Sequence, residues 1–356
     1  MRALALAVAP SIRPEGDEHT YIYLAARMAQ GDGFVEHGGI IRAPGYSAFV
    51  ALVSFTGLGA ELAARIAQVV LAVATQVSLV AVLQRTHGSK VAVAASWVLA
   101  VYPETILYAL LLRPETLYVA LFAVATALAF RILASTGATA WREAVGAGAC
   151  FGIACLVRSI PLYFLPLAGA WLVLHSTARR RAALAAALVV ACAMATILPW
   201  TIRNARHYHR FLPVDATLGY NMAIGNNLFP PPNWEVGRGS KVSYELCADE
   251  NLVDRDRCNV KRALRFIREN PFLFLARIPV KLADFWGPPA GIMNRIRAGT
   301  FGNLPAWTAG ATGLLYHAVM VSAAIGVALP ARGAASAPQS TSRFSPATRS
   351  RSTSSC

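Results

Sequence analysis

Residues 179–200 read RRRAALAAALVVACAMATILPW, and this stretch decides the fold class. Its last nineteen residues, 182–200, carry no charge, and a helix needs about 20 apolar residues to cross the hydrocarbon of a bilayer. Comparable apolar stretches occupy residues 45–58, 62–83, 90–111, 115–134, 144–157, 160–175 and 305–330. The sequence therefore predicts an all-α integral membrane protein, a multi-spanning helical bundle.

The number of spans follows from the lengths of these stretches. Counting an apolar stub at residues 1–10, we expect seven or eight membrane helices. One or two of the shorter stretches are expected to be re-entrant or interfacial, and 45–58 is the best candidate for such a piece.

Composition supports a membrane protein over a nucleic-acid-binding one. Hydrophobic residues make up 56% of the 356 residues and charged residues only 14%, whereas soluble domains carry roughly 25% charged residues. The net charge of +15 has an ordinary source in the arginines of cytoplasmic loops. No basic helix with interleaved aromatic residues is visible, so the expected partner is the lipid bilayer and not nucleic acid.

The distribution of Lys and Arg predicts the topology. With residues 85–90 taken as cytoplasmic, the loops expected inside hold seven Lys or Arg and those expected outside hold two, Arg113 and Arg158. This assignment places the polar loop 11–43 and the long segment 201–304 on the outer face. The chain is thus expected in the inner (plasma) membrane as a multi-pass protein, with its working face toward the periplasm or the extracellular medium.

Four regions follow from the same pattern. Residues 1–200 form the transmembrane core with its first outer loop at 11–43, and residues 201–304 form an extracytoplasmic segment with amphipathic helices. A last transmembrane helix is expected at 305–330 and a disordered tail at 331–356. Within the outer segment, Cys247 and Cys258 form either a disulfide, which an oxidising compartment permits, or two free thiols.

Polar residues near the predicted outer boundary are the candidates for chemistry. Asp17 and Glu18 lie in the first outer loop, where a carboxylate can accept the proton of a hydroxyl group, although these residues alone favour a solvated loop with a helix N-cap at Asp17. Arg158 lies between two apolar stretches, where a charge is expensive unless it is functional or reaches the interface. Arg113 opens a turn that helix capping alone explains, and Arg203 follows an interfacial tryptophan.

A metal is not indicated by these residues. His207 and His209 are two positions apart, which is neither helical spacing nor common zinc-ligand spacing. Asp17, Glu18 and His19 are no metal signature by themselves.

Taken in order, these clusters resemble the bacterial glycosyltransferases of the protein O-mannosyltransferase and aminoarabinose-transferase type, which have the GT-C architecture. The likeness covers roughly residues 14–290. It is carried by Gly16-Asp17-Glu18 with Tyr21, Gly31-Asp32-Gly33-Phe34, Arg42-Ala43-Pro44-Gly45-Tyr46, Arg113-Pro114-Glu115-Thr116-Leu117, Leu198-Pro199-Trp200-Thr201-Ile202-Arg203-Asn204, Gly219-Tyr220-Asn221, Gly225-Asn226-Asn227, Ile267-Arg268-Glu269-Asn270-Pro271, Lys281-Leu282 and Phe285-Trp286.

The resemblance implies a function and roles for several residues. It implies transfer of a sugar from a polyprenyl-phosphate donor to a lipid, glycan or protein acceptor. It makes Asp17 the expected general base, with Glu18 second, and it gives the donor phosphate to Arg42, Arg158 and Arg203, with Arg113 as a weaker candidate. No cofactor is implied with certainty, and a divalent metal stays an open alternative.

Two other classes of function remain. A transporter or flippase of lipid-linked sugar would also need many helices and a charge within the membrane, but it is expected to show internal repeats, and none is visible. A noncatalytic scaffold for envelope assembly would tolerate the loss of Asp17.

Overall fold

The protein was analysed as a computed structural model, which describes residues 1–8, 12–34, 40–134, 138–228, 247–248, 251–302 and 304–328. Over these residues the chain is helical, with one isolated bridge between Ile41 and Ala216. The predicted all-α class is confirmed. The helices are α1 (Arg2–Val8), α2 (Asp17–Ala29), α3 (Gly45–Ser54), α4 (Ala60–His87), α5 (Ser89–Val101), α6 (Pro103–Tyr108), α7 (Glu115–Ala134), α8 (Ala138–Val157), α9 (Ile160–His175), α10 (Arg179–Tyr208), α11 (Leu218–Gly225), α13 (Leu252–Glu269), α14 (Pro271–Phe285), α15 (Ala290–Arg297) and α16 (Trp307–Ala328).

Five helices of the described chain are long and apolar enough to cross a membrane: α4, α7, α8, α10 and α16. Helices α3, α5 and α9 are apolar but shorter. Fewer full spans result than the seven or eight expected. Pro103 divides the stretch 90–111 into α5 and α6, α1 has only seven residues, and α9 has only 16. The stretch 45–58 forms only the ten-residue helix α3, as a short piece should.

Small residues allow the central helices to approach closely. A Cβ atom added at Gly148 of α8 would lie 2.5 Å from the Val189 carbonyl oxygen of α10, and one at Gly152 would lie 2.5 Å from Thr196 Cβ. Membrane helices associate through such close backbone contacts because lipid offers no hydrophobic driving force. Helices α8 and α10 therefore form a rigid pair within the bundle.

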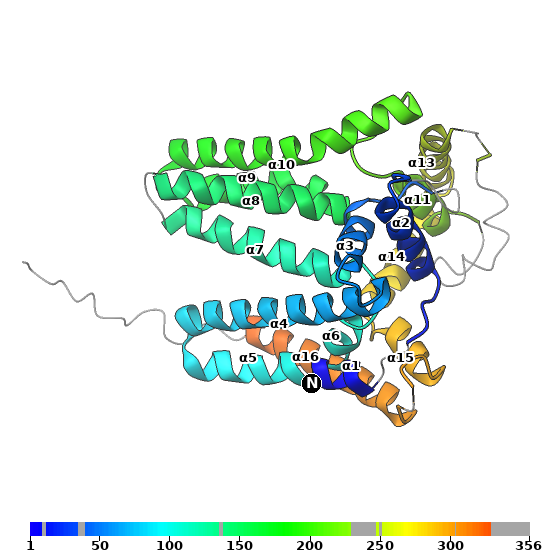
Figure 1. Cartoon of the computed structure of the whole chain (residues 1–356). Coiled ribbons are helices and arrows are strands. Elements are labelled where there is room, and N and C mark those ends of the chain that lie inside the picture. The colour runs from blue at the N-terminus through cyan, green and yellow to red at the C-terminus, as the bar shows by residue number, and fades with distance from the viewer. Residues whose placement is uncertain are drawn as a thin grey trace, which may run out of the picture.

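The shorter helices gather at one end of the bundle. Figure 1 shows α2, α11, α13, α14 and α15 together at the right-hand end of the long helices, while the turns that join α4 to α5 and α9 to α10 lie at the opposite end. The first outer loop and the segment after α10 thus share one end, in agreement with the alternation of charged loops. The bridge from Ile41 to Ala216 joins them directly.

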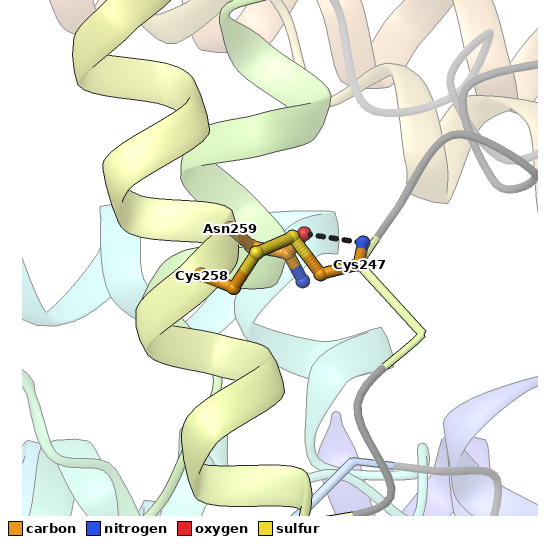
Figure 2. The surroundings of a disulfide bond; sticks show 3 residues. All are labelled: Cys247, Cys258 and Asn259. Atoms are coloured by element: carbon orange, nitrogen blue, oxygen red, sulfur yellow. Dashed lines mark hydrogen bonds between the residues drawn. A yellow bond between two sulfur atoms is a disulfide. The ribbon is translucent and has the colours of Figure 1, made fainter.

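A disulfide fixes part of the outer segment. Cys247 and Cys258 are bonded, with their Cα atoms 6.1 Å apart, and the Asn259 side chain accepts a hydrogen bond from the Cys247 N–H at 3.0 Å (Figure 2). The sequence left this pairing open between a disulfide and two thiols. The predicted tail at 331–356 lies outside the described residues.

Candidate functional site

A cavity of about 490 Å³ lies where the first outer loop meets the segment after α10. Three of the residues singled out in the sequence, Asp17, Arg42 and Arg158, line it together. Its other lining residues are Tyr21, Ile40, Ala43, Val157, Ser159, Ile160, Asp215, Thr217, Tyr220 and Asn221.

Two backbone contacts bring these distant segments together. A Cβ atom at Gly45, the first residue of α3, would lie 2.8 Å from the Leu156 carbonyl oxygen, so the start of α3 touches the end of α8. The Ala216 N–H donates to the Ile41 carbonyl oxygen at 3.0 Å. Arg42, between these contacts, is therefore held beside both the end of α8 and the loop that precedes α11.

Asp17 is the first residue of α2 and is oriented by Arg42. Its Oδ1 accepts a hydrogen bond from Arg42 Nη2 at 3.0 Å, and its side chain is 48% exposed. The positive end of the helix dipole also favours a carboxylate at this position. Among the described residues its second oxygen, Oδ2, has no hydrogen-bond partner, so it is open to a ligand in the cavity.

Arg158 follows α8 and forms an ion pair with Glu115 at the start of α7. Arg158 Nη2 and Glu115 Oε1 are 2.5 Å apart, while Arg158 Nε and Glu115 Oε2 are buried without a partner among the described residues. Glu115 lines a second, mostly apolar cavity of about 380 Å³ between α4, α5, α6 and α7. The ion pair thus connects the walls of the two cavities.

Glu18 and Arg113 lie outside the lining of the larger cavity. Glu18 is fully buried; its Oε1 accepts a hydrogen bond from Arg113 Nε at 3.3 Å and forms an ion pair with Arg295 Nη1 at 2.7 Å. Consecutive residues of a helix point about 100° apart, so Asp17 and Glu18 cannot face the same space. Glu18 instead joins α2 to α15 and to the turn before α7.

Arg203 is held within an aromatic cluster and is likewise absent from the lining. Its guanidinium carbon lies 4.9 Å from the ring centre of Trp200, 5.5 Å from that of Tyr208 and 5.8 Å from that of Phe34. Its Nη2 donates to the Phe34 carbonyl oxygen at 2.6 Å. The cation–π contacts and this bond fix the first outer loop to α10.

Asp215 belongs to the cavity but was not predicted from the sequence. The carbonyl group before it, that of Val214, accepts from Trp200 Nε1 at 2.9 Å and from Asn204 Nδ2 at 3.1 Å. Asp215 follows a helix end in an irregular loop, so no periodicity marks it. Only its position in the sequence could have indicated it, because Asp215 lies between the Trp200–Asn204 motif and the Gly219-Tyr220-Asn221 motif.

Burial changes the acid–base properties of two lining residues. It raises the pKa of Asp215 to about 6, although hydrogen bonds from Ser159 and Thr217 oppose the rise. Burial also raises the pKa of Tyr21 to about 12, so this phenol stays neutral and serves only as a hydrogen-bonding group. Among the residues that the structure covers, no group of three His, Cys, Asp or Glu is placed to hold a metal ion.

Of the comparisons with known proteins, the one with protein families gives a match. Residues 42–202 match the family model described as dolichyl-phosphate-mannose-protein mannosyltransferase. The match runs from Arg42 through α3 to most of α10 and includes Glu115 and Arg158, whereas Asp17 and Asp215 lie outside it. Neither a curated protein nor a solved structure gives a significant match. Together with the helical membrane fold, the match over this part of the chain supports a membrane glycosyltransferase of the GT-C type.

Proposed function

We propose that the larger cavity transfers a sugar from a polyprenyl-phosphate donor to an acceptor on the outer face of the membrane. The acceptor is a hydroxyl or amine group of an envelope lipid, glycan or protein. The observation that supports this most is the meeting of Asp17, Arg42 and Arg158 on one cavity wall at one end of the bundle. A base and two phosphate-binding cations are what this transfer requires.

Asp17 acts as the general base. An acceptor oxygen attacks the anomeric carbon, its proton passes to Asp17 Oδ2, and the bond from the anomeric carbon to the phosphate oxygen breaks. Arg42 orients the Asp17 carboxylate through the 3.0 Å contact. Positioned general bases contribute about 10²–10⁴-fold to the rate.

Arg158 receives the departing phosphate. Its Nε is buried without a partner among the described residues, which leaves one donor unused by Glu115. Donors aimed at the charge that develops in a transition state act strongly where water is excluded. Arg113 pairs with Glu18, and Arg203 is held in the aromatic cluster. Arg158 and Arg42 are therefore the residues that bind the donor phosphate.

The apolar cavity between α4 and α7 suits the first isoprene units of the donor. It adjoins the Arg158–Glu115 pair, so a lipid chain seated there would end at the phosphate-binding side of the larger cavity. A polyprenyl chain dissolves only in hydrocarbon, whereas its sugar phosphate needs a polar chamber.

The first prediction concerns Asp17. We expect Asp17→Asn to lower transfer by about 10²–10⁴-fold, because asparagine keeps the contact to Arg42 but accepts no proton. The measurement is release of free polyprenyl phosphate by purified protein from a panel of polyprenyl-phosphate sugars.

Asp32→Asn is the matched control. Asp32 lies in the same loop and pairs with Arg27 at 3.1 Å, and its side chain is 40% exposed, but it does not line the cavity. Equal release by wild type and Asp17→Asn would remove Asp17 from the mechanism. Movement of intact donor across vesicles without any release would favour the flippase.

A further inference from the structure

One wall of the larger cavity consists of neutral polar groups and a second carboxylate. Ser159 directly precedes α9, Asp215 and Thr217 lie in the loop before α11, and Asn221 lies in α11. Arg158 directly precedes Ser159, and its charge acts on Asp215, whereas Arg42 lies before α3. Among the described residues no ion pair involves Asp215, so this part of the cavity offers mainly hydrogen-bonding groups.

This wall is held rigidly by its backbone. Val214 and Ala216, on either side of Asp215, are fixed by the Trp200 side chain and by the Ile41 bridge. Thr217 Oγ1 donates to Asp215 Oδ1 at 3.3 Å. A wall whose backbone is already ordered binds a ligand without the entropy loss of ordering a loop.

The start of α11 is anchored from behind. Asp256 of α13 accepts hydrogen bonds from the backbone N–H groups of Gly219 at 2.8 Å and Tyr220 at 3.3 Å. A Cβ atom at Gly219 would lie 1.9 Å from the Asp256 carbonyl oxygen, so only glycine permits this approach. The disulfide at Cys258 fixes the same turn of α13 (Figure 2).

Asp215 is the residue of this wall that lowers the stability of the fold. No ion pair joins it to a lysine or arginine in the described ranges, and burial and the nearby Asp256 both raise its pKa. A partly buried carboxylate without a cation lowers stability, so a carboxylate retained in a cavity is a candidate for ligand binding. Asp215 accepts from Ser159 and Thr217, and its two oxygens have room for further donors, which hydroxyl groups of a ligand would supply.

We propose that Asp215, with Thr217 and Asn221, is the sugar-binding subsite of this cavity and accepts hydrogen bonds from ring hydroxyl groups of the donor. This inference rests on the proposed function. A planar carboxylate accepts from two neighbouring hydroxyl groups at once, as it does from the two donors of an arginine. Arg42 and Arg158 then hold the phosphate, and Asp215 selects the sugar attached to it.

The test compares the affinity of the full chain in detergent for a bare lipid phosphate and for the same lipid carrying a sugar. The probes are undecaprenyl phosphate and the same lipid carrying mannose, glucose, galactose or arabinose. We expect wild type to bind at least one glycosylated lipid more tightly than the bare phosphate. Asp215→Ala should reduce that affinity ratio about tenfold while binding of the bare phosphate persists, because a lost pair of hydrogen bonds to a charged acceptor costs this order of affinity.

The control and the contrary outcomes separate this inference from the proposed function. Asp284→Ala removes an exposed carboxylate of α14 and should leave the ratio unchanged. A ratio that Asp215→Ala does not alter, or a wild type without any preference, overturns the subsite. Because the readout is binding, a chain that prefers a glycosylated lipid yet never transfers its sugar would keep the subsite and refute the transferase.

Discussion

At the residue scale, neighbouring carboxylates have separate tasks. Asp17 reaches the cavity and has a free oxygen, whereas Glu18 is buried between Arg113 and Arg295 and keeps α2 in place. A buried ion pair stabilises the fold weakly but is strongly destabilising when one partner is removed. The motif Asp17-Glu18 thus combines one carboxylate that lines the cavity with one that is buried in ion pairs, because consecutive helix residues point in different directions.

The raised pKa of Asp215 predicts how the stability of the fold depends on pH. Its folded-state pKa of about 6 exceeds the ordinary value of 3.8, so the folded state holds the proton more tightly than the unfolded state. Asp215 therefore lowers stability progressively as pH rises from about 4 to 6, and the penalty is fully present above that window. We expect Asp215→Asn to raise the melting temperature at pH 7.5 and to change it less at pH 4.5.

The measurement is a thermal melt of both proteins across that pH range. Asp284→Asn, which removes an exposed carboxylate, provides the comparison. A melting temperature that falls equally at both pH values would assign Asp215 a structural role instead.

At the element scale, α13 supports α11 and through it the cavity. The helix begins at Asn251, whose side chain accepts from the N–H groups of Val253 and Asp254. Asp256 caps the start of α11, and the disulfide ties Cys247 to the same helix. Loss of the disulfide should therefore make α11, and with it one wall of the larger cavity, more mobile, although neither cysteine lines that cavity.

The corresponding prediction is for Cys247→Ser combined with Cys258→Ser. Closing a loop of this length contributes about 3 kcal/mol to stability, so we expect a lower melting temperature and weaker transfer. Wild type treated with a reductant should behave in the same way. The control is Cys192→Ser, which replaces a free thiol in α10 and should leave the reductant effect intact. Reductant without any effect on melting would show that the disulfide is not needed.

At the scale of the whole molecule, the cavity is lined by residues of α2, α11, the segment before α3 and the junction of α8 and α9, and α2 and α11 lie at one end of the bundle (Figure 1). We expect Gln30→Cys and Arg206→Cys, both exposed at that end, to react with a membrane-impermeant maleimide in intact cells. Thr177→Cys, exposed in the turn between α9 and α10, should react only after the cells are made permeable.

The labelling should use a chain in which Cys150, Cys155, Cys192 and Cys356 are replaced by alanine. If positions 30 and 206 were labelled from opposite sides of the membrane, the first outer loop and the segment after α10 would lie on different faces. That result would refute a shared site. Labelling of both from the cytoplasm would invert the proposed face.

The sequence by itself determined the class, the helices and the end at which polar residues collect, because hydrocarbon requires long apolar helices and charge is confined to their ends. Tertiary structure alone decided which polar residues meet. Glu18 and Arg203 make buried contacts. Asp215 is placed at the cavity by its neighbours Val214 and Ala216, which bond to Trp200 and Ile41. Side-chain direction and long-range contact follow from packing, which no local pattern in the sequence encodes.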